Sequence, residues 1–178
     1  TEARQRDLNH VSFEERDFLD EHVLNINKFD YIVGNPPYVP IDKLSESEKS
    51  RYRDQFDTAT GRFDLYLLFF EQALNLLAQE GRLAIVTPEK FEYVKSAAPL
   101  RRLLTNGEYH IESIEHIDDT TFDSHNTFPC ITQICHQPSD SNETTQVTLR
   151  DNTTHTASFP LNGESWAASV RGKAATDW

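Results

Sequence analysis

The chain has 178 residues, of which 37% are hydrophobic, so it has the size of one compact domain and too little apolar content for two well-cored domains. No apolar run approaches the roughly 20 residues that cross a bilayer, which predicts a chain that does not enter a membrane. The 29 acidic residues outnumber the 17 basic ones and give a formal net charge of −12. That charge argues against non-specific binding to a polyanion.

Two details of composition bear on the environment of the protein. The basic residues are 11 Arg and only 6 Lys, and Thr is plentiful, a mixture that suits a very salty cytoplasm. We therefore expect halophilic adaptation, which a requirement of molar salt for folding would test. Cys130 and Cys135 lie five residues apart, where strand alternation sends them to opposite faces. We expect no disulfide between them and a cytoplasmic location.

A strand and a short helix are predicted first along the chain. The β-branched run 31–33 is followed by Gly-Asn-Pro-Pro at 34–37, which predicts a buried strand that ends abruptly. Ser45 and Glu48 fit a capping box, and the polar segment that follows predicts a solvated helix as far as Gln55.

A longer helix and a second strand are predicted next. Apolar residues recur at helical spacing over residues 63–77, with Gln72 as the one polar intruder. Gly81 is expected to end this helix, because glycine is common just beyond helix C-termini. The apolar run 83–86 then predicts another buried strand.

The remaining pattern completes an α/β domain. Thr87 and Pro88 are expected to start a helix that runs to about Leu104, and residues 111–117 and 128–135 are strand candidates. The order strand, helix, strand, helix predicts a mostly parallel sheet. Because no helix pattern separates the last two strands, we expect them to pair antiparallel at one end of that sheet.

The segment Asn35-Pro36-Pro37-Tyr38 follows the first strand, where doubly wound sheets place their sites. Each proline fixes its own φ, lacks an N–H donor and pushes the preceding residue toward extended backbone. The Asn35 amide oxygen and the Pro36 carbonyl can together accept both protons of an exocyclic amino group, with the Tyr38 ring beside it. A tight turn without chemistry is the plain alternative for Asn-Pro-Pro alone.

Ordered segments over about residues 17–134 resemble the gamma-ordered, TaqI-like N6-adenine DNA methyltransferases, including fused restriction–modification enzymes. Any single segment would be a weak signal, whereas their common order is specific. In chain order the matching parts are Asp-Phe-Leu at 17–19, Asn-Pro-Pro-Tyr at 35–38, Asp-Leu-Tyr at 64–66 with Phe69 and Glu71, the segment 81–91, and Thr121-Phe122 with 128–131.

The resemblance implies a Rossmann-like, S-adenosylmethionine-dependent methyltransferase fold with a cofactor site and a catalytic site. Asn35 and Pro36 would hold the adenine N6 amine for in-line attack on the methyl group. Tyr38 and Phe122 would stack on the extruded base, and stacking of about 1–3 kcal/mol per base roughly offsets the extrusion cost. The implied residues are Asp17, Phe18, Pro37 and Phe69 for the cofactor and Asn35, Pro36, Tyr38 and Phe122 for catalysis.

Two parts of that family's pattern are missing from the sequence. No Phe-x-Gly-x-Gly loop precedes Asp17, and the expected target-recognition domain is absent or barely begun at residues 162–178. We therefore expect a slice of a longer enzyme that is inactive alone. Residues 1–137 would be part of the catalytic domain, and residues 138–178 its end or a linker toward a recognition domain.

The resemblance also implies partners. Double-stranded DNA would be the partner of a monomeric, adenine-specific enzyme, with a restriction nuclease either fused or separate. No metal is expected, because the seven His show no metal-ligand spacing. Two alternatives stay open: a protein methyltransferase that acts on a glutamine amide through a similar loop, and an inactive remnant or DNA-specificity module. The sequence after the loop favours DNA adenine over glutamine.

Overall fold

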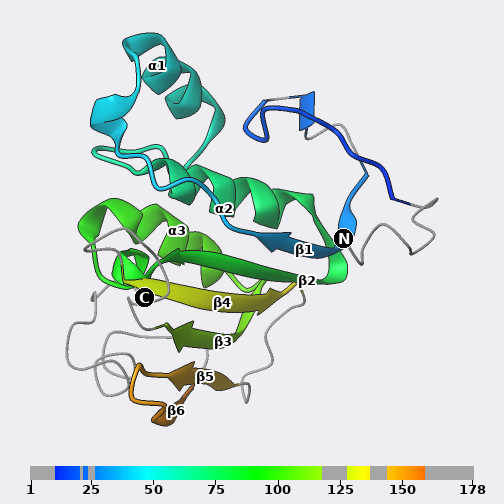
Figure 1. Cartoon of the computed structure of the whole chain (residues 1–178), viewed down its shortest axis with the longest axis vertical. Coiled ribbons are helices and arrows are strands. Elements are labelled where there is room, and N and C mark those ends of the chain that lie inside the picture. The colour runs from blue at the N-terminus through cyan, green and yellow to red at the C-terminus, as the bar shows by residue number, and fades with distance from the viewer. Residues whose placement is uncertain (1–10, 21, 24–26, 118–127, 137–143, 159–178) are drawn as a thin grey trace, which may run out of the picture.

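The computed structural model describes residues 11–20, 22–23, 27–117, 128–136 and 144–158. Its strands form one sheet (Figure 1). The strands are β1 (Phe29–Gly34), β2 (Leu77–Pro88), β3 (His110–His116), β4 (Pro129–Cys135), β5 (Thr144–Thr148) and β6 (Thr154–Ser158). The α-helices are α1 (Glu46–Gln55), α2 (Leu65–Leu76) and α3 (Ala98–Leu104), and short 3-10 helices lie at Ile41–Lys43, Glu89–Glu92 and Lys95–Ala97.

The six strands lie in the order β1-β2-β4-β3-β5-β6. β1 pairs parallel with β2, and β3 with β5, whereas β4 runs antiparallel to both of its neighbours and β6 antiparallel to β5. The expected antiparallel pairing of the two strand candidates is confirmed, but β4 lies inside the sheet and not at its end. The sheet is mixed and not mostly parallel as predicted, because the pairings β2–β4, β3–β4 and β5–β6 are all antiparallel. The connection from β2 to β3 crosses over the sheet through α3, which leaves room for β4 between them.

The hairpin of β5 and β6 continues the same sheet beyond β3. Its side chains Val147 and Ala157 are buried in the same apolar cluster as α2 and α3. Residues 144–158 therefore belong to the structural unit that contains β1. The expectation that residues 138–178 form the end of the catalytic domain or a linker stays a prediction, and positions 137–143 and 159–178 lie outside the described residues.

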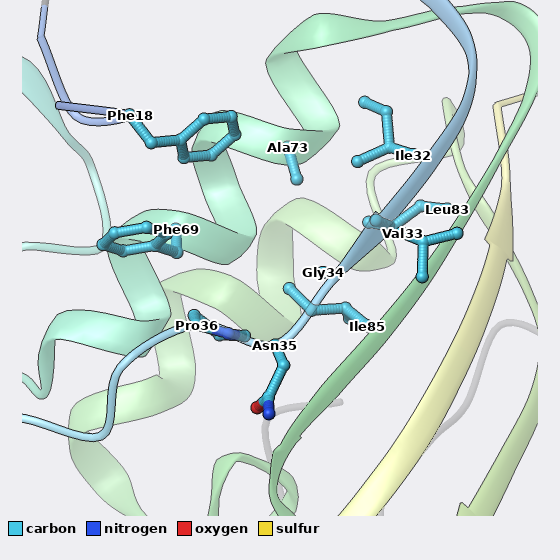
Figure 2. Close-up of a pocket in the computed structure, with 10 residues that line it drawn as sticks. All are labelled: Phe18, Ile32, Val33, Gly34, Asn35, Pro36, Phe69, Ala73, Leu83 and Ile85. Carbon is cyan, nitrogen blue, oxygen red and sulfur yellow. The ribbon is translucent and has the colours of Figure 1, made fainter. Parts of the chain in front are cut away.

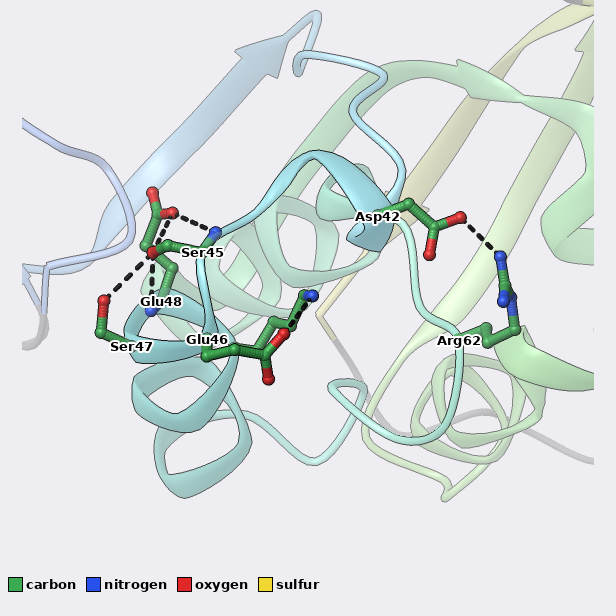
Figure 3. A network of polar contacts seen from close by, with 7 residues as sticks. Asp42, Ser45, Glu46, Ser47, Glu48 and Arg62 are labelled. Atoms are coloured by element: carbon green, nitrogen blue, oxygen red, sulfur yellow. Dashed lines mark hydrogen bonds and ion pairs between the residues drawn. The ribbon is translucent and has the colours of Figure 1, made fainter.

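α1 begins at the predicted capping box (Figure 3). Ser45 Oγ accepts a hydrogen bond from the Glu48 backbone N–H at 3.3 Å, and the Glu48 carboxylate accepts one from the Ser45 N–H at 2.8 Å. These contacts satisfy N–H groups that have no partner within the helix. Only Tyr52 of α1 is buried, so the predicted solvated helix is confirmed.

α2 confirms the long predicted helix, but the helix ends at Leu76 and the chain passes directly into β2. The prediction that Gly81 ends the helix is wrong, because Gly81 lies within β2. A Cβ atom on Gly81 would lie 2.8 Å from the Ala78 carbonyl oxygen and 3.0 Å from that of Phe29. The backbones approach closely here, where the register between β1 and β2 shifts, so this position requires glycine.

The predicted helix from Thr87 to Leu104 is wrong for its first half. Pro88 is the last residue of β2, and the two 3-10 helices occupy most of the stretch before α3. α3 has Pro99 in its first turn. Proline is tolerated there because the first turn needs no N–H from it, whereas it would break the interior of a longer helix.

β1 is a strand as predicted, but the prediction that it is buried is wrong. Tyr31 and Val33 are 76% and 85% exposed, whereas Ile32 is half-buried. β1 is the edge strand of the described sheet, and Ile32 lies beside Leu83 on the face that α2 covers. Tyr31 and Val33 lie on the opposite face, where none of the described helices covers them.

Both cysteines, Cys130 and Cys135, are free and buried in β4, as predicted. Within the described ranges, no helix combines the length and apolar composition that crossing a bilayer requires. The same ranges contain no group of three His, Cys, Asp or Glu side chains that could hold a metal ion.

Candidate active site at the carboxyl end of β1

Residues 34–38 leave β1 at its carboxyl end and lie between two pockets. The apolar pocket has a volume of about 240 Å³ and is lined by Phe18, Ile32, Val33, Gly34, Asn35, Pro36, Phe69, Ala73, Leu83 and Ile85 (Figure 2). The Tyr38 pocket has a volume of about 400 Å³ and is lined by Tyr38, Pro40, Pro88, Glu89, Lys90, Tyr93 and Phe128. The predicted loop thus borders both cavities.

Two aromatic rings form one side of the apolar pocket. Phe18 and Phe69 stack with ring centroids 5.4 Å apart and planes at 24°. Figure 2 shows these rings across the pocket from Ile32 of β1, and the Asn35 side chain lies farther along the same strand end. The structure therefore brings together two predicted cofactor residues with Asn35 and Pro36.

Gln72 holds the Phe18 segment in place. Its buried side chain donates from Nε2 to the Phe18 carbonyl oxygen at 3.2 Å. This contact accounts for the single polar residue in the apolar pattern of α2. A polar residue at an apolar position was visible in the sequence, but its partner was not.

Asp17 lies next to Phe18 and is exposed. Its Oδ1 accepts a hydrogen bond from the Leu19 N–H at 3.0 Å, and Oδ2 lies 3.4 Å from Nη2 of Arg51 on α1. Leu19 is buried and anchors the segment. A carboxylate thus stands beside the aromatic side of the apolar pocket.

Tyr38 contacts the Asn35 side chain directly. Its hydroxyl lies within donating distance of Asn35 Oδ1, at 3.4 Å, and of the Val86 carbonyl, at 3.3 Å. Burial, with a smaller effect of Cys130, raises the pKa of Tyr38 to about 12, so the phenol stays a donor at neutral pH. An amide oxygen has two lone pairs, so Oδ1 keeps acceptor capacity for a second donor.

The two prolines of the loop differ in position. Pro36 is buried and lines the apolar pocket. Pro37, predicted to bind the cofactor, is exposed and lies outside the residues that line either pocket.

Tyr66 supports the Tyr38 ring from α2. The two rings meet edge to face, with centroids 6.2 Å apart and planes at 81°, and Tyr66 is 1% exposed. Lys90 lies with Nζ 5.8 Å from the Tyr66 ring and forms an ion pair with Asp64. The sequence motif contained Asp64 and Tyr66, but nothing in the spacing linked them to Tyr38.

Phe128 lies at the rim of the Tyr38 pocket and is 45% exposed. The Arg150 guanidinium lies 4.6 Å from its ring centroid and also pairs with Glu89. In the sequence, Phe128 begins a strand candidate and belongs to the segment 128–131 of the family resemblance, but it has no predicted role of its own. Phe122, the predicted second stacking ring, lies outside the described residues.

Known proteins with related sequences and folds bear on this site. The family model of the Eco57I restriction-modification methylase matches residues 2–122. Type II methyltransferase M.XhoI of Xanthomonas vasicola is 36% identical over 107 residues, which are 60% of this chain and 20% of that protein. The type II restriction enzyme and methyltransferase RM.Eco57I of Escherichia coli is 31% identical over 107 residues, 58% of this chain and 11% of that protein.

A solved structure shares the fold. The type I restriction-modification system methyltransferase subunit from Streptococcus thermophilus superposes with a TM-score of 0.55 at 21% identity, over 74% of this chain and 29% of that one. The present chain spans a fifth or less of the two sequence relatives. The family match covers more than half of the chain and includes β1, α2 and the Asn35 loop. The chain therefore belongs to the Eco57I restriction-modification methylase family.

Proposed function

We propose that the natural protein transfers a methyl group from S-adenosylmethionine to N6 of adenine in double-stranded DNA, as the modification activity of a restriction–modification system. Family membership supports DNA methylation with S-adenosylmethionine as the cofactor. The observation that carries the finer assignment is the Tyr38 hydroxyl at 3.4 Å from Asn35 Oδ1, between the two pockets. This arrangement presents acceptors and an aromatic ring to one amino group.

The apolar pocket fits the adenosine part of that cofactor. Phe18 and Phe69 offer aromatic surface, and the Asp17 carboxylate beside them suits an amino group on a bound ring. At about 240 Å³ the pocket is smaller than the roughly 300–1,000 Å³ of ordinary ligand pockets, so the described residues would enclose only part of the ligand. Pro37 has no support here as a cofactor contact.

The residues of the loop would act on the amino group by orientation. S-adenosylmethionine supplies the electrophilic methyl group when bound. Asn35 Oδ1 and the Pro36 carbonyl would accept the two amino protons, which turns the nitrogen lone pair away from the ring system and toward the apolar pocket.

The Tyr38 pocket suits the target base. Its volume of about 400 Å³ lies within the range of ligand pockets, and Tyr38 offers a flat wall. Extrusion of a base costs a few kcal/mol, and stacking of about 1–3 kcal/mol per base offsets much of this cost. Phe122 as a second stacking ring stays a prediction.

Duplex DNA is the proposed partner. The relative RM.Eco57I is by name both a restriction enzyme and a methyltransferase, which supports a nuclease in the same system. A glutamine side chain has an amide NH2 of similar chemistry, so the loop alone does not separate the two substrates. The family match favours DNA.

The substrate is tested with the natural full-length chain that carries these residues. The protein is incubated with labelled S-adenosylmethionine and either duplex DNA or glutamine-containing peptides. We expect N6-methyladenine in the nucleoside digest of the DNA, detected by mass spectrometry, and no labelled peptide. Label in the peptide alone would identify the glutamine alternative, and label in neither would indicate an inactive remnant.

A further inference from the structure

One wall of the Tyr38 pocket is a segment with little regular structure of its own. Residues 88–94, here called the wall loop, connect β2 toward α3 and include Glu89, Lys90 and Tyr93, which line the pocket. Within the loop, the N–H groups of Tyr93 and Val94 donate to the Lys90 carbonyl at 3.1 and 2.9 Å. Short 3-10 turns of this kind are less stable than α-helix, so the position of the wall loop depends on contacts from other elements.

Arg101 makes such a contact from α3. Its side chain is 0% exposed, and Nη1 donates to the carbonyl oxygens of Phe91 at 2.6 Å and Val94 at 2.9 Å. Arginine is almost never fully buried unless its charge is matched by acceptors. Hydrogen bonds from a charged donor are about twice as strong as neutral ones, so these two bonds hold the wall loop firmly.

A second buried contact holds the same loop from the sheet. Glu92 Oε1 lies 2.8 Å from Nε2 of His116 on β3, and both side chains are at most 3% exposed. Phe91, Glu92 and Val94 are thus held on the protein side. Tyr93 lies between the held positions and lines the pocket.

We propose that Arg101 is a positioning residue for methyl transfer: by holding the Phe91 and Val94 carbonyls, it sets where Lys90 and Tyr93 stand opposite Tyr38. This role rests on the proposed function, because it concerns the pocket assigned to the target base. A displacement of about 1 Å in such a wall costs on the order of 100-fold in rate. The Phe18 side of the apolar pocket is held separately by Gln72 on α2, so cofactor binding does not depend on Arg101.

The test compares Arg101→Lys with Arg102→Lys in the natural full-length chain. Arg102 is the next residue of α3 and is exposed, so its variant controls for the loss of a guanidinium from that helix. A lysine at 101 keeps the charge but has a shorter stem and lacks the planar fork. We expect kcat for DNA methylation to fall about 10- to 100-fold relative to Arg102→Lys, with KM for S-adenosylmethionine within about twofold.

A second readout follows the base itself. With 2-aminopurine at the target position, we expect a smaller fluorescence enhancement in Arg101→Lys than in Arg102→Lys. Equal kcat and equal fluorescence in the two variants would overturn the proposal. So would a loss in which KM for the cofactor rises together with the loss of kcat, because that pattern indicates general damage to the fold.

Arg101→Gln is the second variant if Arg101→Lys does not fold. The glutamine amide can donate to one of the two carbonyls without placing a charge in the interior. We again expect kcat to fall while KM for S-adenosylmethionine stays within about twofold. If neither variant folds, Arg101 serves folding and not position, and the proposal is overturned. Failure of the proposed function is seen separately, in the unaltered protein, as absence of methylated adenine.

Discussion

Gln72 links the aromatic side of the apolar pocket to helix α2. Its Nε2 donates to the Phe18 carbonyl, while the Phe18 ring stacks on Phe69, three residues earlier on the same helix. Gln72 is 1% exposed, and this bond satisfies its buried Nε2, whereas its Oε1 has no hydrogen-bond partner among the described residues. This amide therefore helps to hold Phe18 in the pocket, together with the buried Leu19 beside it.

Gln72→Leu is expected to weaken the binding of S-adenosylmethionine about tenfold. Leucine suits the apolar face of α2, but the variant leaves the Phe18 carbonyl without its donor, a loss of about 1–3 kcal/mol that is relieved if Phe18 moves away. Isothermal titration with the cofactor measures the affinity, and Gln79→Leu at an exposed position of β2 is the control. Equal affinity in the two variants would show that Gln72 does not position Phe18.

Local contacts at the site were predictable, and distant ones were not. Asn35 and Tyr38 are only three residues apart, so the proximity of their side chains could be expected from the sequence alone. Gln72 and Phe18 are separated by 54 positions, and Tyr38 meets Val86 across 48. Such pairings depend on how β1, α2 and β2 pack, which no local pattern encodes.

At the scale of elements, the junction of β1 and β2 shows what a single glycine permits. A Cβ at Gly81 would meet three backbone carbonyl oxygens, those of Ala78, Phe29 and Asp30, at 2.8 to 3.1 Å. Backbone atoms cannot move aside as readily as the end of a flexible side chain. The sheet therefore tolerates no side chain at this point.

Gly81→Ala is expected to lower the free energy of unfolding by about 1–3 kcal/mol, the usual cost of forcing an extra group into a packed site. Urea denaturation measures the change. Gly34→Ala is the matched control on the neighbouring strand, because a Cβ there would lie 4.0 Å from the nearest atom, in Ile85. A Gly81 variant as stable as the Gly34 variant would contradict the close approach.

Elements that start from local signals were predicted best. The capping box of Ser45 and Glu48 marks the start of α1, because both partners lie within one turn. The start of β2 directly after α2 was missed, since helix and strand meet there without a turn residue. The short 3-10 turns before Pro99 were also missed, because their geometry depends on buried contacts such as that of Arg101.

At the scale of the whole molecule, the α/β class followed from the order of patterns, but the order of strands did not. An antiparallel strand at the end of the sheet and one between β2 and β3 give the same pattern along the chain. The position of β4 between β2 and β3 depends on the crossover through α3. It also depends on the burial of β4 residues such as Cys130 and Ile134 between those two strands. These are contacts between distant segments.

The acidity of the molecule is compatible with the proposed site. Around the Tyr38 pocket, Lys90 pairs with Asp64, and Arg150 pairs with Glu89, so these basic groups are matched by acids. In molar salt the Debye length is about 3 Å, and phosphate attraction contributes little there. Stacking and amide acceptors still act under such conditions. Halophilic adaptation stays a prediction.

The central claim is that Asn35 holds the amino group that receives the methyl. The most direct measurement is the rate of labelled methyl transfer to duplex DNA by Asn35→Ala in the natural full-length chain, with cofactor affinity measured alongside. Gln133→Ala, which removes an exposed amide from β4, is the control. We predict a loss of about 100- to 1000-fold in Asn35→Ala, with cofactor affinity within about twofold of the control. Transfer by Asn35→Ala at the rate of the control would contradict the account.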